Sequence, residues 1–162
     1  MRLFEVKKIT VENYSKDPYY SRVVNAAAEL LTRYGYVSPI MLFQEMELLS
    51  EKDVESWRRG SISYLEKAIR CNLSKASRIL RILRFHAHDL NLMPSRTDYK
   101  RKTASGCIPL RFSKSGQAKL EEVYSTHFVS QRLRTAKMPL EATAKKRAAP
   151  QGRVMRLSTI RK

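Results

Sequence analysis

The sequence predicts a mainly α-helical domain with a small β-hairpin over residues 1–130, followed by a disordered, flexible basic tail over residues 131–162. Three observations support this fold class. Apolar residues recur at helical spacing between residues 17 and 90, and an alternation typical of strands replaces that spacing after Pro94. Residues 131–162 hold ten lysines and arginines against one acidic residue, Glu141, which is typical of a segment that forms no core.

Composition limits the class of protein. The chain has 162 residues, and 43% of them are hydrophobic, which is enough to build a core. Lysine and arginine number 32 against 15 acidic residues, so the formal net charge is +17. This charge favours a nucleic acid as the partner and an acidic protein surface as the second choice.

Location and redox environment also follow from composition. No apolar run approaches the roughly 20 residues that span a bilayer, and the charged N-terminus does not resemble a secretory signal. Cys71 and Cys107 lie far apart without a second pair, which indicates a reducing compartment and no disulfide. We therefore expect no membrane partner and a cytoplasmic protein, with association with the nucleoid as one form of that location.

Capping residues delimit the first helices. Helix starts are marked by polar residues, two of them followed by proline, and helix ends by glycine. The expected starts are Asp17 with Pro18, Ser38 with Pro39, and Ser50, and the expected ends are Gly35 and Gly60. Apolar spacing predicts a fourth helix over about residues 62–71, and weak alternation over residues 3–10 predicts a short strand.

A hairpin is expected after the helices, at about residues 97–113. Its strands are predicted over residues 97–102 and 108–113, around a loop that ends at Gly106. Pro109 favours an edge or strand-end position for the second strand. A last helix is expected over about residues 117–128.

The most informative segment is a long helix expected over residues 73–90. At 100° per residue its two faces differ in chemistry. The apolar face contains Ala76, Ile79, Leu80, Leu83, Ala87 and Leu90. The opposite face contains Ser74, Ser77, Arg78, Arg81, Arg84 and His88. Guanidinium groups and hydroxyls on one face are suited to phosphates and guanine edges.

The residues that precede this helix resemble the helix-turn-helix of bacterial winged helix-turn-helix proteins over about 20 residues. Ala68 is the small residue where two helices approach, Asn72 stands at the turn in place of glycine, and Ser74 is at the cap of the recognition helix. Arg78 departs from the pattern, which usually has an apolar residue there. The resemblance implies a winged-helix-like domain. An ordinary helical hairpin with a solvated charged face is the alternative.

The resemblance also implies a role for two of the basic segments. The helix would reach bases and phosphates, and the hairpin would contact an adjacent phosphate strand or a minor groove. Apart from the resemblance, the charge of the tail favours phosphate contacts that do not depend on sequence, and a solvated terminus with no specific role is the alternative. The predicted nucleic-acid-binding residues are Ser74, Lys75, Ser77, Arg78, Arg81, Arg84, Arg96, Lys100, Arg101, Lys102, Arg111, Lys145, Lys146 and Arg147.

Metal and catalytic chemistry are not expected. His86 and His88 lie two residues apart, so on a helix they diverge by about 200° and do not share an ion readily. The chain has no P-loop, dinucleotide fingerprint, nucleophile elbow or paired carboxylates at a plausible spacing. We therefore predict no metal, no cofactor and no enzymatic activity.

Three functional hypotheses follow. The first is a small DNA-binding module that contacts a duplex through the 74–90 helix, the 97–113 hairpin and the basic tail. The second is a protein that binds RNA or a ribonucleoprotein mainly through the tail. The third is an adaptor for an acidic protein partner, with the Trp57 region and Phe85 as anchors. The sequence leaves open the target sequence and the oligomeric state, and it favours DNA over RNA without deciding between them.

Overall fold

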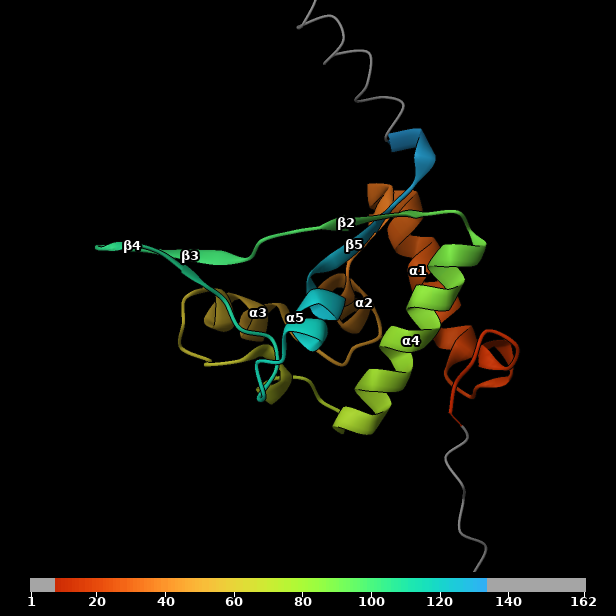
Figure 1. Cartoon of the computed structure of the whole chain (residues 1–162), viewed down its shortest axis with the longest axis horizontal. Coiled ribbons are helices and arrows are strands. Elements are labelled where there is room, and N and C mark those ends of the chain that lie inside the picture. Colours follow the sequence, from red (N-terminus) through yellow and green to blue (C-terminus); the bar gives the residue numbers. More distant parts are fainter. Residues whose placement is uncertain (1–7, 134–162) are drawn as a thin grey trace, which may run out of the picture.

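The computed structural model describes residues 8–133, which form a group of helices with a small antiparallel sheet along one edge and a hairpin that projects from the sheet (Figure 1). The helices, including two short 3₁₀ turns, are η1 (Tyr14–Lys16), α1 (Tyr20–Tyr34), α2 (Pro39–Glu45), α3 (Glu51–Arg58), η2 (Leu65–Lys67), α4 (Leu73–Asp89) and α5 (Ala118–Ser125). The strands are β1 (Tyr36–Val37), β2 (Met93–Arg96), β3 (Lys100–Thr103), β4 (Gly106–Pro109) and β5 (Thr126–Val129).

The sheet joins segments that are distant in the sequence. The strand order is β1-β5-β2, and both pairs of neighbouring strands are antiparallel. Phe128 in the central strand β5 lies opposite Val37 of β1 and opposite Pro94 of β2. β3 and β4 pair only with each other, with Thr103 opposite Gly106. β2 and β5 are neighbours in the sheet, and the hairpin and α5 lie between them in the chain. The chain therefore leaves the sheet after β2, forms the hairpin and α5, and returns to the sheet as β5.

The predicted helix boundaries are confirmed where a local cap defines them. Ser38 Oγ accepts a hydrogen bond from the Met41 N–H at the start of α2, and Ser50 Oγ accepts one from the Asp53 N–H at the start of α3. Gly35 ends α1 with a left-handed φ of 75°. The first helix begins three residues after Asp17, whose side chain is used elsewhere.

The core forms where α1, α2, α3, α4 and α5 meet. Trp57, Phe43 and Tyr124 are among the largest fully buried side chains. The indole Nε1 of Trp57 donates to the Arg111 carbonyl at 2.7 Å, so this buried polar group is satisfied. The apolar face of α4 is buried as predicted except for Leu90, which lies just beyond the helix and is 46% exposed.

The expected helix over residues 62–71 is wrong. Only the short turn η2 forms there, because the backbone bonds to a distant segment instead of to itself. The Leu65 N–H donates to the Arg111 carbonyl at 3.2 Å, and the Glu66 N–H donates to the Phe112 carbonyl at 2.9 Å. Leu65 is fully buried by this pairing.

The helix-turn-helix expected over residues 64–77 is therefore absent from this segment. Ala68 lies outside any α-helix. Asn72, not Ser74, caps α4, since its Oδ1 accepts from the Lys75 N–H at 2.8 Å, and its φ of −71° is not left-handed. The two helices that a short turn does join are α2 and α3, and Glu47 in that turn has a φ of 60°.

Two further expectations differ from the structure. The last helix ends at Ser125, and the residues after it extend as β5 because they pair with both β1 and β2. Residues 8–10 of the expected first strand are not in a strand, and residues 1–7 lie outside the described part. The predicted tail also lies outside it, apart from residues 131–133.

Candidate binding surfaces

The exposed strip of α4 is narrower than the sequence predicts. Ser74, Ser77, Arg84 and His88 are exposed along it, and Arg81 is half-buried beside them. The two arginines thus share one side of the helix, as expected. Arg78 does not belong to this strip, and the structure shows why.

Arg78 is bound to the N-terminal segment, which we define as residues 8–19. Its Nε donates to Asp17 Oδ2 at 3.2 Å, and its Nη2 donates to the same oxygen. The Asp17 side chain is 3% exposed and that of Arg78 is 28% exposed. The other oxygen, Asp17 Oδ1, accepts from the Tyr19 N–H at 2.9 Å. In this structure the Arg78 guanidinium is therefore engaged by Asp17 and largely withdrawn from solvent.

Other contacts fix the same segment against α4. The Tyr14 ring lies 5.6 Å from the Phe85 ring, and the Tyr14 hydroxyl donates to Asp89. The bond to this carboxylate, with a smaller effect of burial, raises the pKa of Tyr14 to about 12. Lys75 lies over the Tyr19 ring with its Nζ 4.9 Å from the ring centre. The N-terminal segment is thus a fixed wall beside α4.

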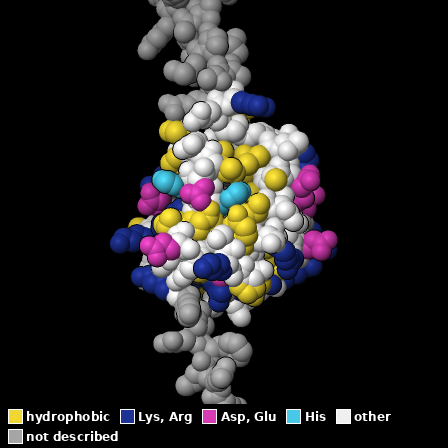
Figure 2. Space-filling model, turned by 90° about the vertical axis from the view of Figure 1, so that its right-hand side faces the viewer, with side chains coloured by type: hydrophobic (Ala, Val, Ile, Leu, Met, Phe, Trp, Pro, Cys, Tyr) yellow, Lys and Arg dark blue, Asp and Glu magenta, His cyan; other side chains and the backbone are white. Residues whose placement is uncertain are grey.

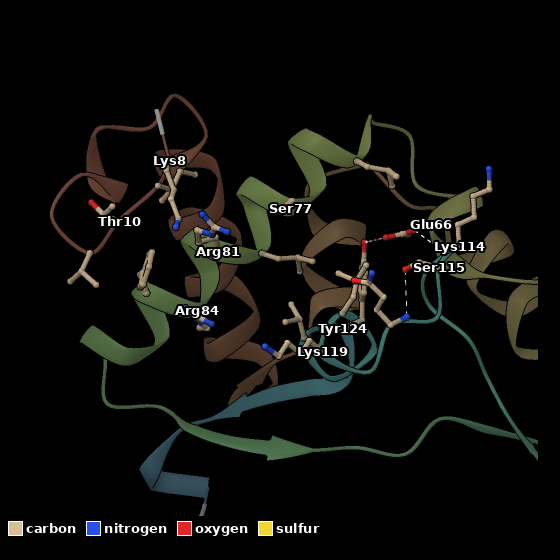
Figure 3. Close-up of a pocket in the computed structure, with 18 residues that line it drawn as sticks. Lys8, Thr10, Glu66, Ser77, Arg81, Arg84, Lys114, Ser115, Lys119 and Tyr124 are labelled. Atoms are coloured by element: carbon tan, nitrogen blue, oxygen red, sulfur yellow. Dashed lines mark hydrogen bonds between the residues drawn. The ribbon is translucent and has the colours of Figure 1, made fainter. Parts of the chain in front are cut away.

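A groove follows α4 between this wall and α5. We name it the α4 groove, and its volume is about 1170 Å³. Figure 3 shows basic side chains around it, with Lys8 on the side of the N-terminal segment and Lys114 and Lys119 on the side of α5. Its basic residues are Lys8, Arg81, Arg84, Lys114 and Lys119. None of the five forms an ion pair with an acid among residues 8–133.

Among the residues that line the groove, Glu66 is the one acid, and both of its carboxylate oxygens already accept hydrogen bonds within the protein. Its Oε1 accepts from the Tyr124 hydroxyl at 3.1 Å, and its Oε2 accepts from the Lys114 N–H at 3.0 Å (Figure 3). Burial, with Glu66 adding to the effect, raises the pKa of Tyr124. The rest of the lining is largely apolar, from Ile9, Leu73, Leu80, Phe85, Leu120 and Val123. The groove thus combines an apolar lining with a basic rim.

The hairpin forms a second basic surface. Lys100 and Lys102 are exposed on one face, whereas Arg101 points back and its Nη1 donates to the Arg59 carbonyl at 3.4 Å. Arg101 also covers Gly60, where a Cβ would lie 2.7 Å from the guanidinium carbon. The hairpin and the end of α3 together present Arg58, Arg59, Lys100, Arg101 and Lys102, which we name the hairpin surface.

The two basic surfaces do not form one interface. The hairpin projects beside α3 at one end of the molecule, and α4 lies towards the other end (Figure 1). The face towards α4 and the N-terminal segment is mixed, with hydrophobic side chains gathered in its middle and acidic ones at its flanks (Figure 2). The structure therefore separates residues that the sequence analysis placed on one interface.

The remaining predicted site residues differ in their surroundings. Arg96 is exposed at the end of β2. Arg111 folds back onto its own loop, where its Nε donates to the Ser113 carbonyl at 2.9 Å and its Nη2 donates to the Lys114 carbonyl. It therefore shapes the loop that holds Lys114. Lys145, Lys146 and Arg147 lie outside the described residues.

The anchors expected for a protein partner are not both available. Trp57 is fully buried, so it does not form part of a docking surface. Phe85 is half-buried between Tyr14 and Arg84, whose guanidinium carbon lies 5.4 Å from the Phe85 ring centre. It still lines the α4 groove.

The histidines and cysteines form no metal site in the part of the chain that the structure describes. His86 packs against Tyr20, and burial lowers its pKa. His127 stacks on Tyr36, its Nε2 is 2.6 Å from the Tyr99 hydroxyl, and burial lowers its pKa as well. Cys71 and Cys107 are both free thiols. No helix within residues 8–133 is long and apolar enough to cross a membrane.

Comparisons of the chain with protein-family models, with curated proteins and with solved structures found no match. The binding surfaces are therefore interpreted from their own geometry. Lys8, Lys114 and Lys119 were missed by the sequence analysis because nothing in their local sequence relates them to α4. Only the packing of the N-terminal segment and α5 places them beside Arg81 and Arg84.

Proposed function

We propose that this protein binds nucleic acid, with DNA favoured over RNA, and that the hairpin surface makes the main phosphate contacts. The observation behind this proposal is a protruding hairpin (Figure 1) on which Lys100 and Lys102 are exposed on one face, while Arg101 on the other face reaches the end of α3, where Arg58 and Arg59 are exposed. A protruding basic element can follow a phosphate backbone, whose contacts are sequence-independent.

Nearby acids do not neutralise this surface. Lys100 pairs with Asp98 at 3.6 Å, and Arg59 pairs with Glu55 at 4.0 Å. Both pairs are exposed, and exposed ion pairs contribute little and exchange readily for other partners. The formal net charge of +17 for the whole chain adds long-range attraction to any polyanion.

The order of the elements supports a winged-helix-like organisation as part of the proposal. The hairpin follows the helices and leaves from between two neighbouring strands of a small sheet, which is the place of a wing. α2 and α3 are joined by a short turn, and α3 lies on the hairpin's side of the molecule. Because α3 begins with Glu51 and Asp53, we expect its basic C-terminal end to approach the phosphates.

The test compares two double charge reversals that change the net charge equally. Lys100→Glu with Lys102→Glu alters the hairpin surface, and Arg81→Glu with Arg84→Glu alters the α4 groove. Fluorescence anisotropy with a labelled duplex of about 20 base pairs measures binding across a salt titration. We expect the hairpin variant to lose at least about tenfold in affinity for the duplex. The slope of the logarithm of the binding constant against the logarithm of the salt concentration should decrease in magnitude by about 2.

The control variant should lose much less. Equal losses in both variants would show that net charge alone governs binding, and no loss in the hairpin variant would refute the assignment. Deleting residues 131–162 separates the RNA alternative from the main proposal. A DNA-binding domain should bind the duplex more weakly after the deletion, whereas a protein that binds RNA through its tail should lose binding to structured RNA almost completely.

A further inference from the structure

We infer that the α4 groove is a docking site for an acidic amphipathic helix of a partner protein. This inference is independent of the proposed function, because no residue of the hairpin surface lines the groove, and the hairpin projects away from α4 (Figure 1). It rests on the charge of the groove, on its apolar lining and on its shape.

The charge of the groove selects an acidic occupant. Five basic side chains line it, and its one acid, Glu66, already accepts two hydrogen bonds. Arg84, Lys114 and Lys119 are exposed, so they can meet carboxylates without losing an existing ion pair. Ser77 and Ser115 add hydroxyl groups to the lining.

The lining of the groove requires that this occupant also has an apolar face. Leu73 is 55% exposed and Val11 is 61% exposed, and the half-buried side chains of Leu120 and Val123 line the groove as well. Aliphatic side chains of this kind gain from burial under other aliphatic side chains. An occupant with carboxylates on its edges and leucine-like residues in its centre satisfies both requirements.

The shape of the groove fits a helix. The residues of α4 that line it extend from Leu73 to Phe85, which is about 18 Å along the helix axis. This length matches three to four turns of a second helix, whose apolar residues at i, i+3, i+4 and i+7 would follow the groove. The volume of about 1170 Å³ exceeds the usual range for small-molecule pockets.

Nucleic acid is a poorer fit. Single strands bind grooves in which exposed aromatic rings stack against the bases. The aromatic rings that line this groove are Phe85, which already packs against Tyr14 and Arg84, and Tyr124, which is 1% exposed. A duplex is read by a helix that protrudes into its major groove, whereas the arginines of α4 line a hollow between two walls. The chain's own residues 134–162 contain nine basic residues and one acid, so a basic rim repels them.

The experiment uses the full chain and a labelled synthetic peptide of about 15 residues, the length of a four-turn helix. In this probe, leucines occupy one helical face and glutamates occupy the rest. One control peptide has the same composition with the leucines dispersed, and another has lysine in place of glutamate. Fluorescence polarisation at physiological salt measures the affinity of each peptide for the wild-type protein.

We expect the acidic amphipathic peptide to bind at least about tenfold more tightly than the dispersed peptide and the lysine peptide to show no binding. Arg81→Glu with Arg84→Glu should weaken binding by at least about tenfold, whereas Lys100→Glu with Lys102→Glu should change it by less than about twofold. Circular dichroism checks that the variants fold. If the double reversal in the groove does not fold, Arg84→Gln at this exposed position is the substitute, with a loss of at least about threefold expected.

Three outcomes overturn the inference. Equal affinity for the amphipathic and dispersed peptides would show that the apolar lining does not contribute to peptide binding. Equal loss in the groove and hairpin variants would place the peptide elsewhere. A single-stranded oligonucleotide that displaces the peptide, and whose own binding is lost in the groove variant, would assign the groove to nucleic acid. None of these outcomes bears on duplex binding by the hairpin surface, so the two proposals fail separately.

Discussion

Replacing Arg78 by alanine is expected to destabilise the protein by about 3 kcal/mol without removing a nucleic-acid contact. Arg78 donates to Asp17 from two nitrogens of its guanidinium group, and the Asp17 side chain is 3% exposed. The substitution leaves this carboxylate buried with the Tyr19 N–H as its remaining donor. Removal of one partner from a buried pair costs about 3–5 kcal/mol, and the partial exposure of Arg78 places the expected value at the lower end.

A double-mutant cycle isolates the pair. We expect Asp17→Asn alone to cost less than Arg78→Ala, because the amide leaves no buried charge and Arg78 can turn towards solvent. The coupling energy between the two positions is expected to be about 2 kcal/mol, whereas exposed ion pairs typically contribute about 0.2–1 kcal/mol. Urea unfolding measures both values, and fluorescence of the single tryptophan, the fully buried Trp57, reports the transition.

Two results would contradict a stabilising role of the Arg78–Asp17 pair. If Arg78→Ala costs less than about 1 kcal/mol and the coupling energy is below about 0.5 kcal/mol, the pair behaves as an exposed one. If the same variant loses duplex binding at full stability, Arg78 is a contact residue, as the sequence pattern predicts. Lys75→Ala is a useful control, because Lys75 contacts Tyr19 in the same segment but leaves no buried charge when it is removed.

Further predictions concern the core and the buried histidines. Trp57→Phe should lower the free energy of unfolding by about 1–2 kcal/mol, measured by urea unfolding followed by circular dichroism, because the hydrogen bond to the Arg111 carbonyl is lost and a small cavity remains. A variant as stable as the wild type would show that this bond contributes nothing. Burial lowers the pKa of both His86 and His127, so below about pH 6.5 the unfolded chain binds protons that the folded chain does not. The stability that depends on these two histidines should therefore be fully present above about pH 6.5 and should decline as the pH falls below it, and His127→Gln should reduce this decline. A pH dependence unchanged by this variant would exclude His127 as a source.

Local signals were reliable where one turn of chain determines the outcome. Ser38, Ser50 and Gly35 delimit helices as predicted, because a cap involves only the adjacent backbone. The buried face of α4 follows from its 3.6-residue period. The hairpin was predicted from alternation around Gly106, although its paired residues are 100–103 and 106–109.

Predictions failed where a distant segment competes for the backbone. Apolar spacing over residues 62–71 resembles that of a helix, yet Leu65 and Glu66 bond to residues 111 and 112. The spacing of apolar residues predicts that residues 126–128 end a helix, but they form β5 because they pair with β1 on one side and β2 on the other. Short-range patterns do not contain these pairings, since the partners lie tens of residues away.

The sequence by itself determined the large positive charge, the long two-faced helix and the basic hairpin, because composition and periodicity are properties of the chain alone. Only the tertiary structure decided which basic residues act together. The pairing of Arg78 with Asp17, 61 positions away, removes one arginine from the exposed strip, and the packing of the N-terminal segment and α5 turns the rest of that strip into a groove. The hairpin lies at the other end of the molecule because the sheet, not α4, sets its direction.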